Sequence, residues 1–150
     1  MSERSRIMTT VLGSCLALGL AATMSGCAGV GKQFADAWAV TYEVVVEGES
    51  TTELHDVSYL DAPGRGEDSA TLPVGTVATL NAVGTPQKAS WRVESQVTAG
   101  QPAEITASAP AGTRISCRIL LDDEKVIASE SEEAGGTITC RTTTPPFEKG

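Results

Sequence analysis

One histidine and four cysteines are the residues of this chain best suited to catalysis or covalent chemistry. His55 stands beside Glu53 and Asp56, which suggests a proton relay, but in a β-strand only Glu53 would share its face. No serine or cysteine lies in a recognisable nucleophile motif. We therefore expect His55 to be a surface residue, and we expect the protein not to be an enzyme.

Two acidic clusters and one glycine-rich segment are weaker candidates for ligand binding. Asp122-Asp123-Glu124 and Glu130-Ser131-Glu132-Glu133 lack the central glycine and terminal glutamate of a calcium loop. Pro63-Gly64-Arg65-Gly66 lacks the lysine and the helix that follow a phosphate-binding loop. We interpret all three as solvated turns and expect neither a metal nor a cofactor.

The charge balance excludes nucleic acid as a partner. The 150 residues include 11 Lys and Arg against 19 Asp and Glu, a formal net charge of −8. Binding to nucleic acid depends on a basic surface that neutralises phosphates. A chain this acidic has no such excess of positive charge.

The first thirty residues have the composition of an export signal. Arg4 and Arg6 precede the segment 7–31, which has no charged residue and is most apolar from Val11 to Ala22. A basic start, a short apolar run and small residues after it are typical of a signal peptide. The alternative is an uncleaved membrane helix, which needs about 20 mainly apolar residues. That length is reached here only by counting several Gly, Ser and Thr.

The end of this signal resembles the lipobox of bacterial lipoproteins. Met24-Ser25-Gly26-Cys27-Ala28 places small residues before a cysteine, whereas Leu12-Gly13-Ser14-Cys15 fits the pattern too early in the apolar run. The resemblance implies a signal peptide over 1–26, lipidation of the Cys27 thiol and an acylated tether over 27–37. Two or more acyl chains anchor a protein stably. We therefore expect a lipid-anchored protein on the extracytoplasmic face of the cell membrane.

Alternation of apolar and polar residues predicts β-strands after residue 37, and no segment shows a convincing helical period. Pro73 and Gly75 interrupt the segment 70–83, which favours one strand near a sheet edge. Gly135-Gly136 predicts a hairpin turn. The expected strands are 38–47, 54–60, one strand within 70–83, 89–97, 103–109, 114–121, 125–129 and 137–141.

The spacing of these strands predicts a single all-β domain over residues 38–141. Short strands about ten residues apart in a domain of this size favour a small antiparallel, immunoglobulin-like β-sandwich. The polar and proline-containing segment 142–150 is expected to be a disordered tail. The expected core comprises Tyr42, Val44, Val46, Val57, Tyr59, Trp91, Val93, Ile115, Ile119, Val126 and Ile138.

Cys117 and Cys140 lie on the apolar faces of their expected strands, beside Ile119 and Ile138 respectively. An even pair of cysteines in an exported domain favours a disulfide. On the chain-entropy estimate, closing the loop between the two cysteines would stabilise the folded domain by about 3.5 kcal/mol. Two free buried thiols remain the alternative, while a metal site is disfavoured because no second pair of ligands accompanies them.

Four short motifs follow one another along the domain: Val40-Thr41-Tyr42-Glu43-Val44, Val57-Ser58-Tyr59-Leu60-Asp61, Ile115-Ser116-Cys117-Arg118-Ile119 and Thr137-Ile138-Thr139-Cys140. Their order resembles the MmpS family, the small accessory proteins of MmpL membrane transporters. The resemblance covers about residues 38–141 and includes the cysteine pattern of Cys117-Arg118-Ile119 and Cys140. Ser90 precedes Trp91 where the family usually has proline.

This resemblance implies a membrane-anchored accessory protein that partners an MmpL-type transporter of the RND class. Such a protein would assist the export of lipids or siderophores by contact rather than by catalysis. The residues leave open a second hypothesis, a free-standing lipoprotein that binds a small apolar ligand at the cell envelope.

Overall fold

The computed structural model describes residues 36–147, which form nine β-strands. The expected signal peptide 1–26 and the lipidation site Cys27 lie outside the described residues, as does nearly all of the tether 27–37. Within residues 36–147, no helix is long and apolar enough to cross a membrane. The strands are β1 (Ala37–Gly48), β2 (Glu53–Asp61), β3 (Ala70–Ala78), β4 (Leu80–Val83), β5 (Gln87–Thr98), β6 (Pro102–Ala109), β7 (Arg114–Leu121), β8 (Lys125–Glu132) and β9 (Gly136–Thr143).

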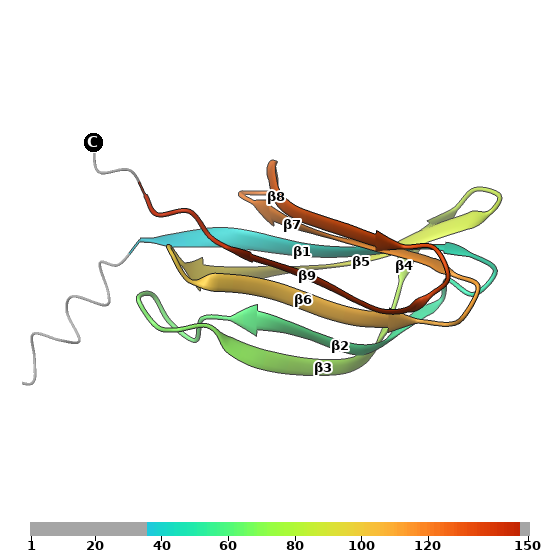
Figure 1. Cartoon of the computed structure of the whole chain (residues 1–150), viewed down its shortest axis with the longest axis horizontal. Coiled ribbons are helices and arrows are strands. Elements are labelled where there is room, and N and C mark those ends of the chain that lie inside the picture. Colours follow the sequence, from blue (N-terminus) through green and yellow to red (C-terminus); the bar gives the residue numbers. More distant parts are fainter. Residues whose placement is uncertain (1–35, 148–150) are drawn as a thin grey trace, which may run out of the picture.

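The nine strands form two antiparallel sheets that pack face to face (Figure 1). The five-stranded sheet has the order β4-β5-β1-β7-β8, and the four-stranded sheet has the order β3-β2-β6-β9. Every pair of neighbouring strands within each sheet is antiparallel. The expected antiparallel β-sandwich is therefore confirmed.

The core lies between the two sheets and follows the alternation of each strand. In β1, Val40, Tyr42, Val44 and Val46 are all buried, because every second side chain of a strand points to the same face. Most of the expected core is confirmed as buried or partly buried. The largest fully buried side chains are Tyr42, Leu54, Ile105, Ile115, Ile119, Leu121, Val40, Val44, Val46, Val57 and Val97.

Val126 is the expected core residue that the structure places on the surface, with 45% of its area exposed. The pairing of β7 with β8 shifts register between Ile119 and Leu120, which face Ala128 and Val126 respectively. This irregularity leaves Ile127 as the extra residue, and Ile127 and Ala128 pack against the core instead. A bulge of this kind reverses the alternation along a strand.

The segment 70–83 contains two strands where the sequence predicts one. β3 and β4 belong to different sheets, and each is an edge strand. Thr79 links them, and its N–H donates a hydrogen bond to the carbonyl of Thr52. Pro73 in β3 thus lies at a sheet edge as expected, where its missing N–H does least harm.

Gly135-Gly136 does not make the expected hairpin, because β8 and β9 lie in different sheets. The connection instead crosses from one layer of the sandwich to the other. Gly135 has φ 75°, and a Cβ there would lie 2.2 Å from the carbonyl oxygen of Pro110. Only glycine fits this close approach of two backbones, so the residue type reflects the crossing rather than a two-residue turn.

The end of the chain that was expected to be a tail is folded as far as Phe147. β9 runs to Thr143, and Thr144 is buried, with its hydroxyl 3.0 Å from the carbonyl oxygen of Gln101. The indole N–H of Trp38 donates to the carbonyl of Pro145 at 2.7 Å, and its ring stacks on Phe147 with the centroids 4.3 Å apart. Trp38 at the start of β1 therefore holds the segment after β9 in place. The composition of residues 142–150 alone does not reveal this contact.

Candidate functional site

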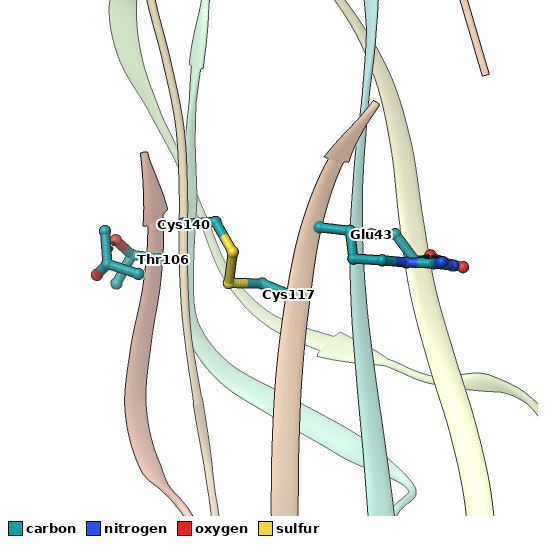
Figure 2. Close-up of a disulfide and its surroundings, with 6 residues drawn as sticks. Glu43, Thr106, Cys117 and Cys140 are labelled. Atoms are coloured by element: carbon teal, nitrogen blue, oxygen red, sulfur yellow. Dashed lines mark hydrogen bonds and ion pairs between the residues drawn. A yellow bond between two sulfur atoms is a disulfide. The ribbon is translucent and has the colours of Figure 1, made fainter. Parts of the chain in front are cut away.

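Cys117 and Cys140 form a disulfide that joins the two sheets. Cys117 comes from β7 and Cys140 from β9, and both side chains are buried among core residues. Figure 2 shows the bridge between the sheets, with Glu43 on the outer side of one sheet and Thr106 on the outer side of the other. The bridge is therefore a structural cross-link rather than an accessible redox centre.

The histidine and its acidic neighbours do not converge on a common site. His55 is partly exposed, and its Nδ1 lies 3.3 Å from the hydroxyl of Thr76 in the neighbouring strand. Asp56 adopts φ 51° at an irregularity of β2, and Glu53 is exposed. No three His, Cys, Asp or Glu side chains among residues 36–147 are grouped so that they could hold a metal ion.

The acidic turn between β7 and β8 has a structural role at the surface. Asp122 and Asp123 both adopt positive φ, which aspartate tolerates better than most residues. The carboxylate of Asp123 accepts a hydrogen bond from the hydroxyl of Thr41 and forms an ion pair with Arg92. The Thr41 hydrogen bond, followed by the Arg92 interaction, holds the pKa of Asp123 below its usual value. This turn fastens β5 and β1 to the β7–β8 connection.

The outer face of the five-stranded sheet carries its side chains in three rows that run across the strands. The rows follow from the register of β1 with β5 and β7, since residues directly opposite one another share a face. The first row is Arg92–Glu43–Arg118, the second is Ser90–Val45–Ser116–Ser131 and the third is Lys88–Glu47–Arg114. We call these three rows the outer furrow, because two rows of long charged side chains flank one row of small side chains.

Two adjoining depressions occupy the outer furrow. One, of about 240 Å³, is lined by Val45, Lys88, Arg114 and Ser116 among others, and the second, of about 230 Å³, also contacts Val45 and Lys88. Val45 therefore forms a shared floor and Lys88 a shared wall. Strands lie about 4.8 Å apart and rise about 3.4 Å per residue. A face that spans the five strands of this sheet and four residues along each strand is therefore large enough for a small ligand.

The β4 side of the furrow is apolar and open to solvent. Leu80 lies opposite Ser90 and Val83 lies opposite Lys88, so both extend the outer face. Leu80 is 66% exposed and Val83 is 65% exposed, and Val83 also lines the second depression. The furrow thus combines a wall that contains Lys88 with an apolar entrance.

The outer furrow collects the cations of an otherwise acidic domain. Residues 36–147 contain seven Lys and Arg against 17 Asp and Glu, and four of the seven cations lie in the furrow. Arg118 donates through Nε to Glu43 at 2.8 Å, and Arg114 pairs with Glu133 at 2.9 Å. Arg92 pairs with Asp123, so Lys88 is the one of the four furrow cations that forms no ion pair among the described residues.

Sequence reasoning missed the outer furrow, although the strands carry a signal for it. Each of its three central strands has two charged residues four positions apart, on the polar side of the alternation. These pairs are Glu43 and Glu47, Lys88 and Arg92, and Arg114 and Arg118. Their convergence depends on which strands are neighbours and in what register, which a single sequence does not reveal.

Among residues 36–147, fold and furrow together define a small antiparallel β-sandwich whose five-stranded sheet carries charged rows and an apolar edge on its outer face. Comparison of the chain with protein families, curated proteins and solved structures finds no match.

Proposed function

We propose that the chain is a membrane-anchored extracytoplasmic accessory protein of an MmpL-type transporter of the RND class. The protein would assist the export of lipids or siderophores by binding the transporter or its cargo. The domain would be carried by an acylated Cys27 on the outer face of the cell membrane. The motif order over residues 38–141 resembles the MmpS family, and the function is the one that this resemblance implies.

The observation that carries the proposal is the Cys117–Cys140 disulfide between the two sheets. It joins two of the motifs on which the resemblance rests, and a stable disulfide is expected outside the cytoplasm. Trp38 at the start of β1 is already part of the folded domain. A chain of about ten residues between Cys27 and β1 spans at most about 35 Å, which would keep the domain at the membrane surface.

A second candidate function is a free-standing lipoprotein that binds a small apolar ligand. The observation in its favour is the exposure of Leu80 and Val83 beside a depression in the outer furrow. The two candidates differ in whether a transporter is needed.

Affinity purification of the full chain from cross-linked native membranes separates them. We expect a transporter of the RND class to co-purify with the wild type. Ligand-dependent stabilisation of a protein that retains no transporter would favour the second candidate and would contradict the first.

A further inference from the structure

We infer that the outer furrow binds a single-chain anionic amphiphile, with its charged head at Lys88 and its apolar chain over Val83, Leu80 and Val45. The inference rests on the proposed function for its setting, a protein that handles lipid-like cargo, and adds the site and the class of ligand. Nothing in it requires a transporter to be bound.

The position of the head group follows from the charges of the furrow. Each charged row has a glutamate between two cations, and Arg92 of the first row is also paired with Asp123. Arg118 is paired with Glu43 and Arg114 with Glu133, which leaves Lys88 as the cation available to a ligand. Glu47 opposes Lys88 in the same row and limits the pull on an anion. A carboxylate or sulfonate of unit charge therefore fits better than a phosphate of higher charge.

The position of the apolar chain follows from the neighbours of Lys88. Val83 lies directly opposite Lys88, and both residues line the depression whose floor is Val45. Leu80 continues this apolar surface at the edge of the sheet. Lysine can keep its ammonium in water while its alkyl stem lies along such a surface. An amphiphile would match this arrangement at both of its ends.

The size of the furrow limits the ligand to one chain. The two depressions meet at Val45 and Lys88, and together they reach the range of about 300–1,000 Å³ that is usual for small-molecule sites. The second row, Ser90–Val45–Ser116–Ser131, has only small side chains, so the floor stays open between the two charged rows. Covering Leu80 and Val83 would remove exposed apolar surface from water, which favours binding.

The test uses a decanoate probe with a diazirine on its terminal carbon, applied to the full chain in native membranes. Photolabelled residues are mapped by mass spectrometry in the wild type, Lys88→Gln, Lys88→Arg and the matched control Lys125→Gln. We expect adducts on β4 and on Val45, and a loss of up to about five-fold in Lys88→Gln, which is the upper end for one exposed ion pair. Lys88→Arg and Lys125→Gln should label like the wild type.

Competition distinguishes an amphiphile site from a merely apolar patch. Unlabelled decanoate should abolish the adducts, whereas the neutral detergent decyl maltoside should displace them far less. Equal displacement by both, equal labelling of Lys88→Gln and wild type, or adducts spread over all exposed apolar residues would overturn the inference.

The same membranes report separately on the proposed function. Furrow labelling that depends on Lys88 but is accompanied by no co-purifying transporter would support the amphiphile site and contradict the accessory role. Co-purification of a transporter, together with furrow labelling that is the same in Lys88→Gln and wild type, would support the accessory role and contradict the amphiphile site.

Discussion

At the scale of single residues, Tyr42 links the two sheets through a polar contact inside an apolar core. Its side chain is fully buried in β1, and its hydroxyl donates to the carbonyl of Leu60 in β2 at 2.6 Å. Its ring also lies against Tyr59, with centroids 5.4 Å apart. The burial of a phenol is tolerated because the hydroxyl has this partner.

The burial of Tyr42 predicts a loss of stability in alkali. Desolvation raises the pKa of Tyr42 well above its usual value of 10.0, so the folded protein keeps a proton that the unfolded chain releases above pH 10. The free energy of unfolding should therefore fall as pH rises past 10, by up to about 1.4 kcal/mol per pH unit. Urea titrations between pH 7 and 11 measure this slope.

Tyr42→Phe should flatten that alkaline slope, while losing about 1 kcal/mol at neutral pH with its hydrogen bond to Leu60. Tyr59→Phe is the matched control and should keep most of the slope, because Tyr59 is less buried. An unchanged slope in Tyr42→Phe would show that another group titrates instead.

The disulfide gives the second prediction at this scale. Replacing both Cys117 and Cys140 with alanine should lower the free energy of unfolding by about 3.5 kcal/mol, because the unfolded chain regains the freedom that the closed loop removes. Urea unfolding of the oxidised wild type, the reduced wild type and the double variant checks this. Two reactive thiols at these positions in the native protein, or equal stability with and without reductant, would contradict it.

At the scale of elements, local alternation is enough to predict most strands of this sandwich. The segment 114–121 is predicted and observed with identical bounds, because apolar and polar residues alternate from Arg114 to Ile119 and no glycine or proline intervenes. Val126 was misplaced because the bulge beside Leu120 arises from pairing with β7, which is invisible in β8 alone. β4 was missed because four residues are too few to show a period.

Long-range contacts account for the remaining differences. Gly135 serves a crossing between sheets because the carbonyl of Pro110 lies against it, and that contact joins distant parts of the chain. The outer furrow depends likewise on the register of β1 with β5 and β7. Residue types at the candidate site could thus be read from the sequence, whereas their convergence could not.

The folded C-terminal segment provides a prediction at the scale of elements. Thr144→Val should destabilise the domain by about 1 kcal/mol, because it removes a buried hydroxyl that bonds to the carbonyls of Thr98 and Gln101. Thr143→Val is the matched control, since Thr143 is exposed at the end of β9. Thermal unfolding compares the two variants. Equal stability of both would mean that residues beyond β9 add nothing to the fold.

At the scale of the whole molecule, the chain enters and leaves the described domain at the same end. Figure 1 shows the start of β1 and the end of the described chain at one end of the sandwich. Trp38, near the start of β1, stacks on Phe147 after the last strand. In the proposed function the acylated tether leads to this end, so the far loops of the sandwich point away from the membrane. The outer furrow runs along the side of the domain, where it would remain accessible to a neighbour in the membrane.

Membrane attachment should depend on one thiol. Labelled palmitate should be incorporated into the wild type and should fail to enter Cys27→Ala, because Cys27 is the residue proposed to carry the anchor. Cys15→Ala is the matched control and should be labelled like the wild type. Incorporation that survives Cys27→Ala would place the anchor elsewhere.

The central claim, partnership with a transporter, is tested most directly by affinity purification from cross-linked membranes with quantitative mass spectrometry. The full chain should enrich a transporter of the RND class well above an unrelated lipoprotein expressed at the same level. Enrichment of that transporter to the same extent by both proteins, or by neither, would contradict the accessory role.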